Sequence, residues 1–351
     1  MTKEVLLLHD VLKIAQKIVP EYVEILLKRY DILRTIYYNQ PIGRRTLSNN
    51  LGMGERIVRT EISFLKEQNL IEINTPGMNV TKEGEEIINK LKDFVHELKG
   101  LSEIEKYIRE KLGLKNIIVV PGNVDEDITV LTELGKAAAL YLKELIKDNS
   151  IIAITGGSTI KEVIDNMPKV QNLNDVLVVP ARGGMGSSVE TQANNLAASL
   201  AKKLGASYKL LHIPDNLSNT ALGAMLNESD VKEIVNNIVN SNILIYGIGR
   251  ADKMAERRGL PTEKLDELIF KGAVGEAFGY YFNADGQIIC STSTIVVDSN
   301  SLKNIENLIA VAAGRNKAEA IISAEKNLSN STLITDEGAA REIINIISKK
   351  E

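Results

Sequence analysis

The chain has 351 residues, of which 44% are hydrophobic and 25% charged, and its formal net charge is -4. This composition excludes disorder across the whole chain, and the length predicts more than one domain of about 100–200 residues. The single cysteine, Cys290, excludes a disulfide framework and a cysteine-rich zinc site. No stretch approaches the ~18 apolar residues of a membrane span, so we expect a cytoplasmic protein with no membrane partner.

The first 80 residues are predicted to form a DNA-binding domain. Residues 14–38 have the apolar spacing of an amphipathic helix. A short helix is expected at 44–50, a glycine-containing turn at 51–54 and a second helix at about 55–68, with five predicted buried residues: Ile57, Val58, Ile62, Phe64 and Leu65. Residues 69–81 then read as a hairpin. Helix, tight turn, helix and hairpin are typical of a winged helix-turn-helix.

The second helix of this motif carries the side chains predicted to read DNA. Its exposed face holds Glu55 and the four candidate DNA-binding residues Arg56, Arg59, Thr60 and Ser63. Arginine can donate two hydrogen bonds to guanine in the major groove. Arg44 and Arg45, on the preceding helix, are better placed for phosphates. Ordinary solvated arginines are the alternative interpretation.

Residues 81–113 are predicted to be a helical linker. Thr81 begins it, and apolar residues recur at spacings of three and four from Leu91 to Ile108. Residues 98–101 can divide it into two helices. The linker can connect two domains, form the seam of a dimer, or do both.

From residue 114 to 351 short apolar strands alternate with helices. Seven runs have this character: 117–120, 151–155, 176–180, 208–213, 243–246, 308–312 and 332–335. Such runs are typical of parallel strands buried on both faces, which predicts a doubly wound α/β domain. Asn283–Gly286 is expected to turn a local antiparallel hairpin. Ligands of doubly wound sheets bind beyond the carboxyl ends of the strands.

The turn Thr155-Gly156-Gly157-Ser158-Thr159 follows one of these strands and precedes a helix. Its backbone N–H groups and the helix dipole favour an anion, and its hydroxyls can add hydrogen bonds. The turn is neither a Walker loop nor GxGxxG, so it does not imply a nucleotide. A glycine turn required only by strand–helix geometry is the alternative.

Other candidate ligands follow neighbouring strands. Arg182-Gly183-Gly184 occupies the equivalent turn after the next strand, and Gln192 can point back to it. Lys317 begins a helix, where a cation is unfavourable unless it binds an anion. Glu276 can accept hydrogen bonds from sugar hydroxyls, or serve as a cap or a paired core acid. Two anion-binding turns predict a ligand with two phosphates, or with one phosphate and one carboxylate.

Catalytic residues are not evident. His9, His96 and His212 are isolated, and neither a metal-ligand spacing nor a nucleophile elbow is present. We therefore expect no catalytic residue, no metal and no cofactor. A sugar-phosphate isomerase or deaminase with an added domain is the rival hypothesis, because fold does not decide function.

Six motifs support a resemblance to a known family: QPIGRRTL at 40–47, FLKEQNL at 64–70, TGGST at 155–159, VPARGG at 179–184, EAFGYYFNADG at 276–286 and TDEGAA at 335–340. Over nearly its whole length the chain resembles the SorC-type sugar-binding transcriptional regulators, most closely the branch that controls central glycolytic genes. The resemblance implies a winged helix-turn-helix domain and an effector domain with the glucosamine-6-phosphate deaminase or ribose-5-phosphate isomerase-like fold.

The resemblance also implies repression of a glycolytic operon that begins with glyceraldehyde-3-phosphate dehydrogenase. The implied effector is fructose 1,6-bisphosphate, which weakens cooperative assembly on operator DNA. Thr155–Thr159 and Lys317 would hold one phosphate, Arg182, Gly183, Gly184 and Gln192 the other, and Glu276 the sugar hydroxyls; Arg250 is a weaker candidate. We expect a homodimer that forms a tetramer on DNA. An activator, or a monophosphate effector such as fructose 6-phosphate or dihydroxyacetone phosphate, remains open.

Overall fold

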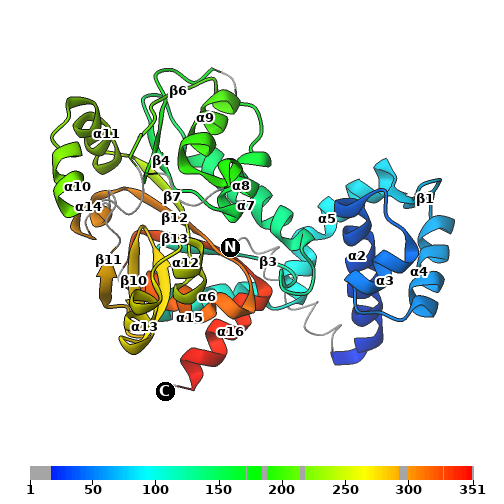
Figure 1. Ribbon diagram of the computed structural model, residues 1–351. Helices are drawn as coiled ribbons and strands as arrows, with labels where there is room; N and C mark the ends of the chain where they lie inside the picture. Colours follow the sequence, from blue (N-terminus) through cyan, green and yellow to red (C-terminus); the bar gives the residue numbers. More distant parts are fainter. Residues whose placement is uncertain are drawn as a thin grey trace. The chain divides into compact units, whose positions relative to one another are not determined.

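The computed structural model describes residues 17–170, 172–183, 188–213, 218–291, 299–326 and 328–349 (Figure 1). The chain divides into two compact units. The first comprises Met1–Glu103 with Glu126–Thr129, and the second comprises Ile104–Asp125 with Val130–Glu351. The helical linker at 81–113 and its exact boundaries stay a prediction.

From residue 17 onward, the first unit contains three helices, a hairpin and a further helix (Figure 1): α2 (Pro20–Asn39), α3 (Arg44–Asn50), α4 (Glu55–Glu67), β1 (Ile71–Ile73), β2 (Met78–Val80) and α5 (Lys82–Leu98). The two strands pair antiparallel, so the predicted helix, turn, helix and wing are confirmed. Val58, Ile62 and Leu65 of α4 lie in the core of this unit. The expectation that Ile57 is buried is wrong, because half of its surface is exposed (50%).

A buried acid ties α4 to α2. Glu61 accepts a 2.8 Å hydrogen bond from Arg29 and pairs with Lys28 at 2.7 Å. Burial opposes ionisation of Glu61, but these bonds outweigh it and hold its pKa below the usual range. The Arg29 guanidinium also lies over the Phe64 ring, 3.5 Å from its centroid. These contacts fix the angle at which α4 stands on the unit.

The helical stretch after the wing is broken, as the sequence suggested. Thr81 caps α5 by accepting a hydrogen bond from the Gly84 N–H. Gly100 has φ 66° and ends α5, and α6 (Leu101–Leu112) begins directly after it.

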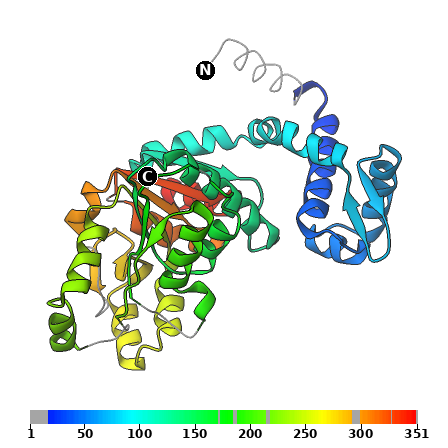
Figure 2. The same cartoon turned by 90° about the horizontal axis from the view of Figure 1, so that it is seen from above.

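A seven-stranded sheet forms the centre of the second unit (Figure 2): β3 (Asn116–Val120), β4 (Ile151–Ile154), β5 (Leu177–Pro180), β6 (Ser207–Tyr208), β7 (Ile243–Gly247), β12 (Asn307–Val311) and β13 (Ser331–Asp336). The strand order is β3-β13-β12-β7-β4-β5-β6, and the pairings described are all parallel. This confirms the doubly wound prediction. The expected strand at 208–213 is wrong, because β6 has two residues and ends at Tyr208.

Helices cover this sheet because alternate strand residues point to opposite faces. On one face α7 (Thr129–Leu145), α8 (Ser158–Asp165) and α9 (Ala193–Leu204) pack on Ile152, Ile245 and their neighbours. Helices α11 (Ser229–Val239) and α16 (Glu337–Ser348) contact the sheet as well, α11 at β4 and β5 and α16 at β3 and β13.

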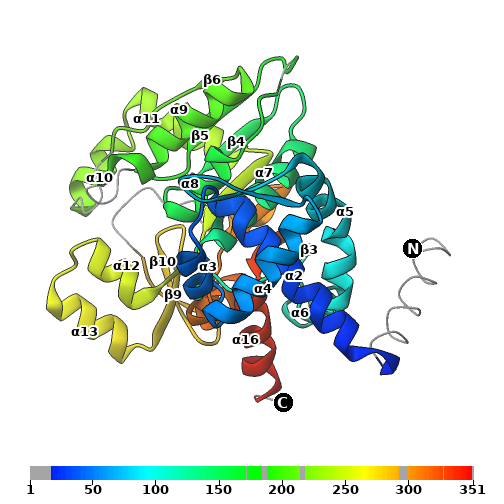
Figure 3. The same ribbon diagram turned by 90° about the vertical axis from the view of Figure 1, so that its right-hand side faces the viewer.

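A smaller antiparallel sheet lies beside the larger one (Figure 3), with the strand order β11-β10-β9-β8. Its strands are β8 (Gly249–Arg250), β9 (Ala273–Ala277), β10 (Tyr280–Asn283) and β11 (Ile288–Ser291). The hairpin predicted at Asn283–Gly286 joins β10 to β11 and is confirmed. The other helical elements described are α10 (Asn219–Met225), α12 (Ala251–Arg257), α13 (Thr262–Phe270), α14 (Ser299–Asn304), α15 (Ala318–Glu325) and the short 3₁₀ turns η1 (Val189–Thr191) and η2 (Arg315–Lys317).

No helix in the described part of the chain is both long and apolar enough to cross a membrane.

Candidate effector pocket and DNA-reading helix

A cavity of about 410 Å³ opens at the carboxyl ends of the central strands. Its walls come from the β4–α8 turn, the end of β5, the β7–β8 connection, α12, the β9–β10 turn and η2. Strands β4 and β7 are neighbours, and the chain winds away from them in opposite directions. The cavity therefore lies at the switch point of the sheet, where such folds bind ligands.

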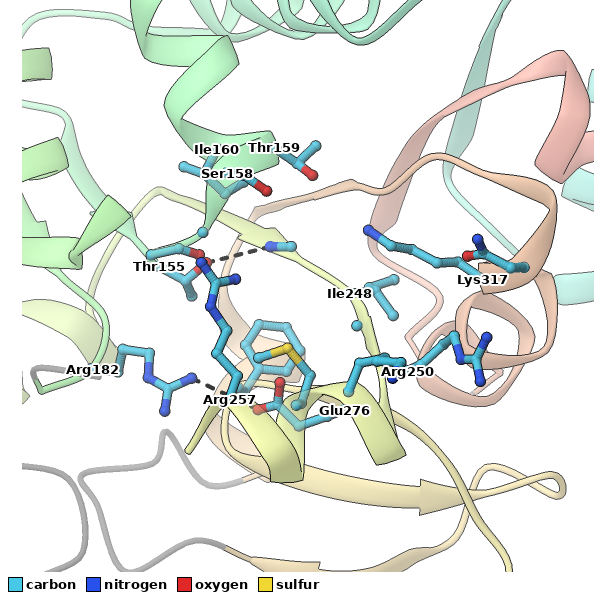
Figure 4. A pocket seen from close by; sticks show the side chains of 18 residues that line it. Thr155, Ser158, Thr159, Ile160, Arg182, Ile248, Arg250, Arg257, Glu276 and Lys317 are labelled. Carbon is cyan, nitrogen blue, oxygen red and sulfur yellow. Dashed lines mark hydrogen bonds and ion pairs between the residues drawn. The ribbon is translucent and has the colours of Figure 1, made fainter. Parts of the chain in front are cut away.

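The β4–α8 turn lies in the wall as predicted, with all five residues Thr155–Thr159 lining the cavity (Figure 4). Gly157 caps α8 with φ 125° and donates its N–H to the Thr191 carbonyl at 2.8 Å. The N–H groups of the next residues, Ser158 and Thr159, begin the helix and have no intrahelical acceptor. A side chain at Gly156 would lie 2.6 Å from the Thr191 oxygen, so this glycine is required for close approach.

Arg182 reaches the same cavity from the end of β5 and is almost fully buried, with 5% of its surface exposed. A small hollow beside the cavity is lined by Gly183 and Gln192, and it shares Gly156, Gly157, Arg182 and Arg257 with the cavity. The structure thus brings together three of the four residues predicted for the second anion. The fourth, Gly184, lies outside the described residues.

Glu276 is both a paired core acid and a wall of the cavity. Its Oε1 accepts hydrogen bonds from Arg258 at 2.7 Å and from the Gly279 N–H at 2.8 Å, and lies 3.7 Å from the Arg182 guanidinium. Its Oε2 makes none of these contacts. The bond to Gly279 closes the two-residue turn between β9 and β10, where Phe278 and Gly279 have φ 59° and 93°.

Lys317, at the end of η2, points its ammonium into the cavity (Figure 4). Burial lowers the pKa of Lys317, while the charges of Asp336 and Asp125 oppose that effect and Arg257 adds to it. An incoming anion would stabilise such an ammonium, because the attraction between the two charges offsets the hydration that burial has removed.

Arg250 also lines the cavity, but its guanidinium is already bound to a carboxylate. Its Nε and Nη2 donate to the two oxygens of Asp252 at 3.1 and 2.7 Å. The ion pair makes Arg250 a less available anion ligand than Lys317.

The contribution of α12 to the cavity was not predicted from the sequence. Lys253 and Arg257, one turn apart on this helix, both line the cavity. The Arg257 side chain extends across it toward Thr155 (Figure 4) and has no hydrogen bond or ion pair with any described residue. Its neighbour Arg258 is instead buried against Glu276 and Tyr281. The available signal was the glycine-containing turn Gly247–Gly249 followed directly by a basic helix.

The predicted DNA-reading side chains lie on one exposed face of α4. Arg56, Arg59, Thr60 and Ser63 are spaced three and four residues apart and are all exposed. The hydroxyls of Thr60 and Ser63 donate to the carbonyls of Arg56 and Arg59, four residues earlier. Arg44 and Arg45, at the start of α3, are exposed too.

Two family models match the chain. The "CggR N-terminal DNA binding domain" matches residues 25–95, and the "Putative sugar-binding domain" matches residues 96–345. The central glycolytic genes regulator of Bacillus subtilis is 41% identical over 337 residues, which are 96% of this chain and 99% of that protein. The corresponding regulator of Priestia megaterium is 40% identical over 338 residues, again 96% and 99% of the two chains.

The chain belongs to the SorC-type sugar-binding transcriptional regulators.

Solved structures of SorC-type regulators agree with this assignment. A SorC family regulator from Enterococcus faecalis has 36% identity and a TM-score of 0.65, covering 69% of this chain and 99% of that one. The full-length sorbitol operon regulator SorC from Klebsiella pneumoniae, at 18% identity, shares the fold with a TM-score of 0.64 over 92% of this chain and 98% of its own. The predicted family and the predicted combination of a DNA-binding with a sugar-binding domain are confirmed.

The rival enzyme hypothesis is not supported for this SorC-type chain. The relatives and structural neighbours named above are transcriptional regulators, which confirms on that ground that the protein is not an enzyme. Among the described residues, no group of three or more His, Cys, Asp or Glu is arranged to hold a metal ion.

Proposed function

We propose that the chain is a cytoplasmic repressor of a glycolytic operon that begins with glyceraldehyde-3-phosphate dehydrogenase. Fructose 1,6-bisphosphate relieves the repression by weakening cooperative binding to operator DNA. One observation carries this proposal: a single chain combines a DNA-reading helix with a cavity lined by five cationic side chains, Arg182, Arg250, Lys253, Arg257 and Lys317. The relatives' names, which refer to glycolytic genes, support the choice of operon.

In this proposal one phosphate binds the N-terminus of α8, between Thr155–Thr159 and Lys317. The other binds Arg182, Gly183, Gly184 and Gln192, and Arg257 reaches the ligand from α12. Oε2 of Glu276 accepts a hydrogen bond from a sugar hydroxyl, while Oε1 keeps its contacts with Arg258 and Gly279. A bisphosphate suits the cavity better than a monophosphate because cations approach it from several elements.

The repressor is proposed to act as a homodimer that forms a tetramer on operator DNA. Paired half-sites require paired recognition helices, and a closed symmetric dimer supplies them. The effector must favour one arrangement over another by its difference in affinity for the two.

The direct test is fluorescence anisotropy of labelled DNA from upstream of the organism's own glycolytic operon, titrated with protein at fixed salt. Salt must be fixed because phosphate contacts make the affinity salt-dependent. We expect tight, cooperative binding that loosens when fructose 1,6-bisphosphate is added. If only fructose 6-phosphate or dihydroxyacetone phosphate loosens the binding, that compound is the effector in place of fructose 1,6-bisphosphate. If none of the three changes the binding, the proposed regulation is contradicted. A transcription assay on the same DNA separates a repressor from an activator.

Replacing Arg59 with alanine is expected to weaken operator binding by about 10- to 100-fold, because one bidentate arginine–guanine contact contributes roughly 1–3 kcal/mol. Binding of fructose 1,6-bisphosphate should not change, since Arg59 is exposed on α4 in the other unit. Lys92→Ala, which removes the same charge from the exposed face of α5, is the control. If the Arg59 variant and the wild type bind the operator with equal affinity, Arg59 does not contact the operator bases.

A further inference from the structure

The loop that carries Lys317 lies directly against an acidic residue of another loop. Gly314 begins this loop with φ 105°, and a Cβ added to it would lie 2.9 Å from Oδ1 of Asp125. Two residues later, Asn316 donates its side-chain amide to Oδ1 of Asp125 at 3.0 Å and its backbone N–H to Oδ2 at 3.4 Å. Asn316 itself lines the cavity beside Lys317.

A second carboxylate holds the two loops in register. The buried Asp336 accepts the N–H of Gly314 through Oδ1 at 3.0 Å and the N–H of Val124 through Oδ2 at 2.8 Å. It also caps α16 by accepting the Ala339 N–H. Three backbone donors therefore offset part of the Asp336 charge. Asp125 is exposed; among the described residues its carboxylate accepts the two bonds from Asn316, and its charge favours the Lys317 ammonium.

These positions set up a competition for the same cation. The Asp125 carboxylate attracts the Lys317 ammonium, and an anion in the cavity would attract it too. Because like charges repel, an acid beside an anion site lowers the affinity of that site and penalises each further negative charge on the ligand. Asp125 also holds Asn316 in place. Its oxygens therefore support the turn that carries Lys317, whereas its charge opposes the binding of an anion.

We propose that Asp125 is a positioning residue of the effector pocket: its oxygens hold the Asn316–Lys317 turn in place, and its charge competes with the ligand's phosphate for Lys317. This inference rests on the proposed binding of a sugar phosphate in the cavity. The charge of Asp125 then lowers the affinity of the pocket for the effector. The wild-type pocket therefore binds a phosphate less tightly than its cations alone would allow.

Two substitutions separate the two effects. Asp125→Asn keeps an acceptor oxygen for Asn316 and removes the charge, whereas Asp125→Ala removes both. Isothermal titration of the full-length chain with fructose 1,6-bisphosphate should show about five-fold tighter binding to Asp125→Asn than to the wild type at low salt. The gain should fall below about two-fold near 0.5 M salt, because the repulsion is screened. Asp125→Ala should bind less tightly than Asp125→Asn.

Glu319→Gln, which removes an exposed acid from the first turn of α15, is the control for net charge and should leave the affinity unchanged. Unchanged or weaker binding by Asp125→Asn overturns the inference while leaving the effector pocket intact. A gain that does not diminish with salt also overturns it, since a structural effect would not be screened. A wild-type chain that binds no sugar phosphate fails the proposed function itself, and this inference with it.

Discussion

Replacing Arg257 with methionine is expected to weaken binding of fructose 1,6-bisphosphate by about 100-fold, which corresponds to roughly 3 kcal/mol and to the loss of one or two charge-assisted hydrogen bonds. Arg257 crosses the mouth of the cavity and has no hydrogen bond or ion pair with a described residue, so its donors are available to a ligand (Figure 4). Because the residue is exposed, thermal stability without ligand should stay close to that of the wild type.

Two matched variants give this prediction its specificity. Lys253→Met removes a cation one turn earlier on α12, where the ammonium is already bound to Glu256 at 3.0 Å, and should cost less than about five-fold. Arg257→Lys keeps the charge but loses the planar fork, and should fall between the wild type and the methionine variant. Isothermal titration measures all three, and a methionine variant within three-fold of the wild type would remove Arg257 from the pocket.

The parts of the pocket that follow from strand order could be predicted from the sequence. Thr155–Thr159 and Lys317 come directly after apolar strands, and parallel strands bring their carboxyl ends to one edge. Arg257 could not be found in this way. It reaches the cavity only because α12 and the small antiparallel sheet fold back over that edge, and neither periodicity nor turn chemistry encodes such a tertiary approach.

Two local errors have physical explanations. The run at 208–213 is apolar enough to suggest a strand, and Leu211 and Ile213 are indeed buried. Leu211 nevertheless bonds to the side chain of Asn194, which accepts its N–H at 2.9 Å and donates to its carbonyl at 3.0 Å. One amide thus replaces a neighbouring strand, and a sequence pattern does not reveal such a partner.

Helix α4 buries a charged residue, Glu61, and leaves Ile57 half exposed. The buried face of α4 contains Val58, Ile62 and Leu65, and its fourth member is Glu61. An acid is unexpected in a core, and it is tolerated here because Lys28 and Arg29 of α2 pair with it. Ile57 lies to one side of this face. Apolarity alone therefore misjudged the rotation of the helix.

Replacing Glu325 with glutamine is expected to change the pH dependence of the stability of the second unit. The difference in the free energy of unfolding, variant minus wild type, should be about 3 kcal/mol larger at pH 8 than at pH 4.5. Glu325 is fully buried on α15 and accepts a 2.6 Å hydrogen bond from Tyr246 through Oε1, while Oε2 has no hydrogen-bond partner among the described residues. Burial raises its pKa from 4.5 to about 7, against the opposing hydrogen bonds from Ser331 and Tyr246.

The sign follows from proton uptake. Between pH 4.5 and about 7 the folded protein keeps a proton on Glu325 that the unfolded chain has released, so the free energy of unfolding falls as pH rises through this window. Each pH unit costs about 1.4 kcal/mol, and the loss is complete above the folded pKa. Glutamine cannot titrate, and its side-chain oxygen can still accept the Tyr246 bond, so the variant should lack this slope.

Urea unfolding followed by circular dichroism at several pH values measures the effect. The transition that fructose 1,6-bisphosphate moves to higher urea belongs to the ligand-binding unit, because a ligand stabilises only the unit that binds it. The glutamine amide leaves donors unsatisfied in place of the protonated Oε2, which can lower stability by a similar amount at every pH. The difference between variant and wild type is therefore compared across pH, with Glu319→Gln as the exposed control on the same helix. A difference that is equal at pH 5 and pH 8 would mean that Glu325 is already ionised in the folded protein.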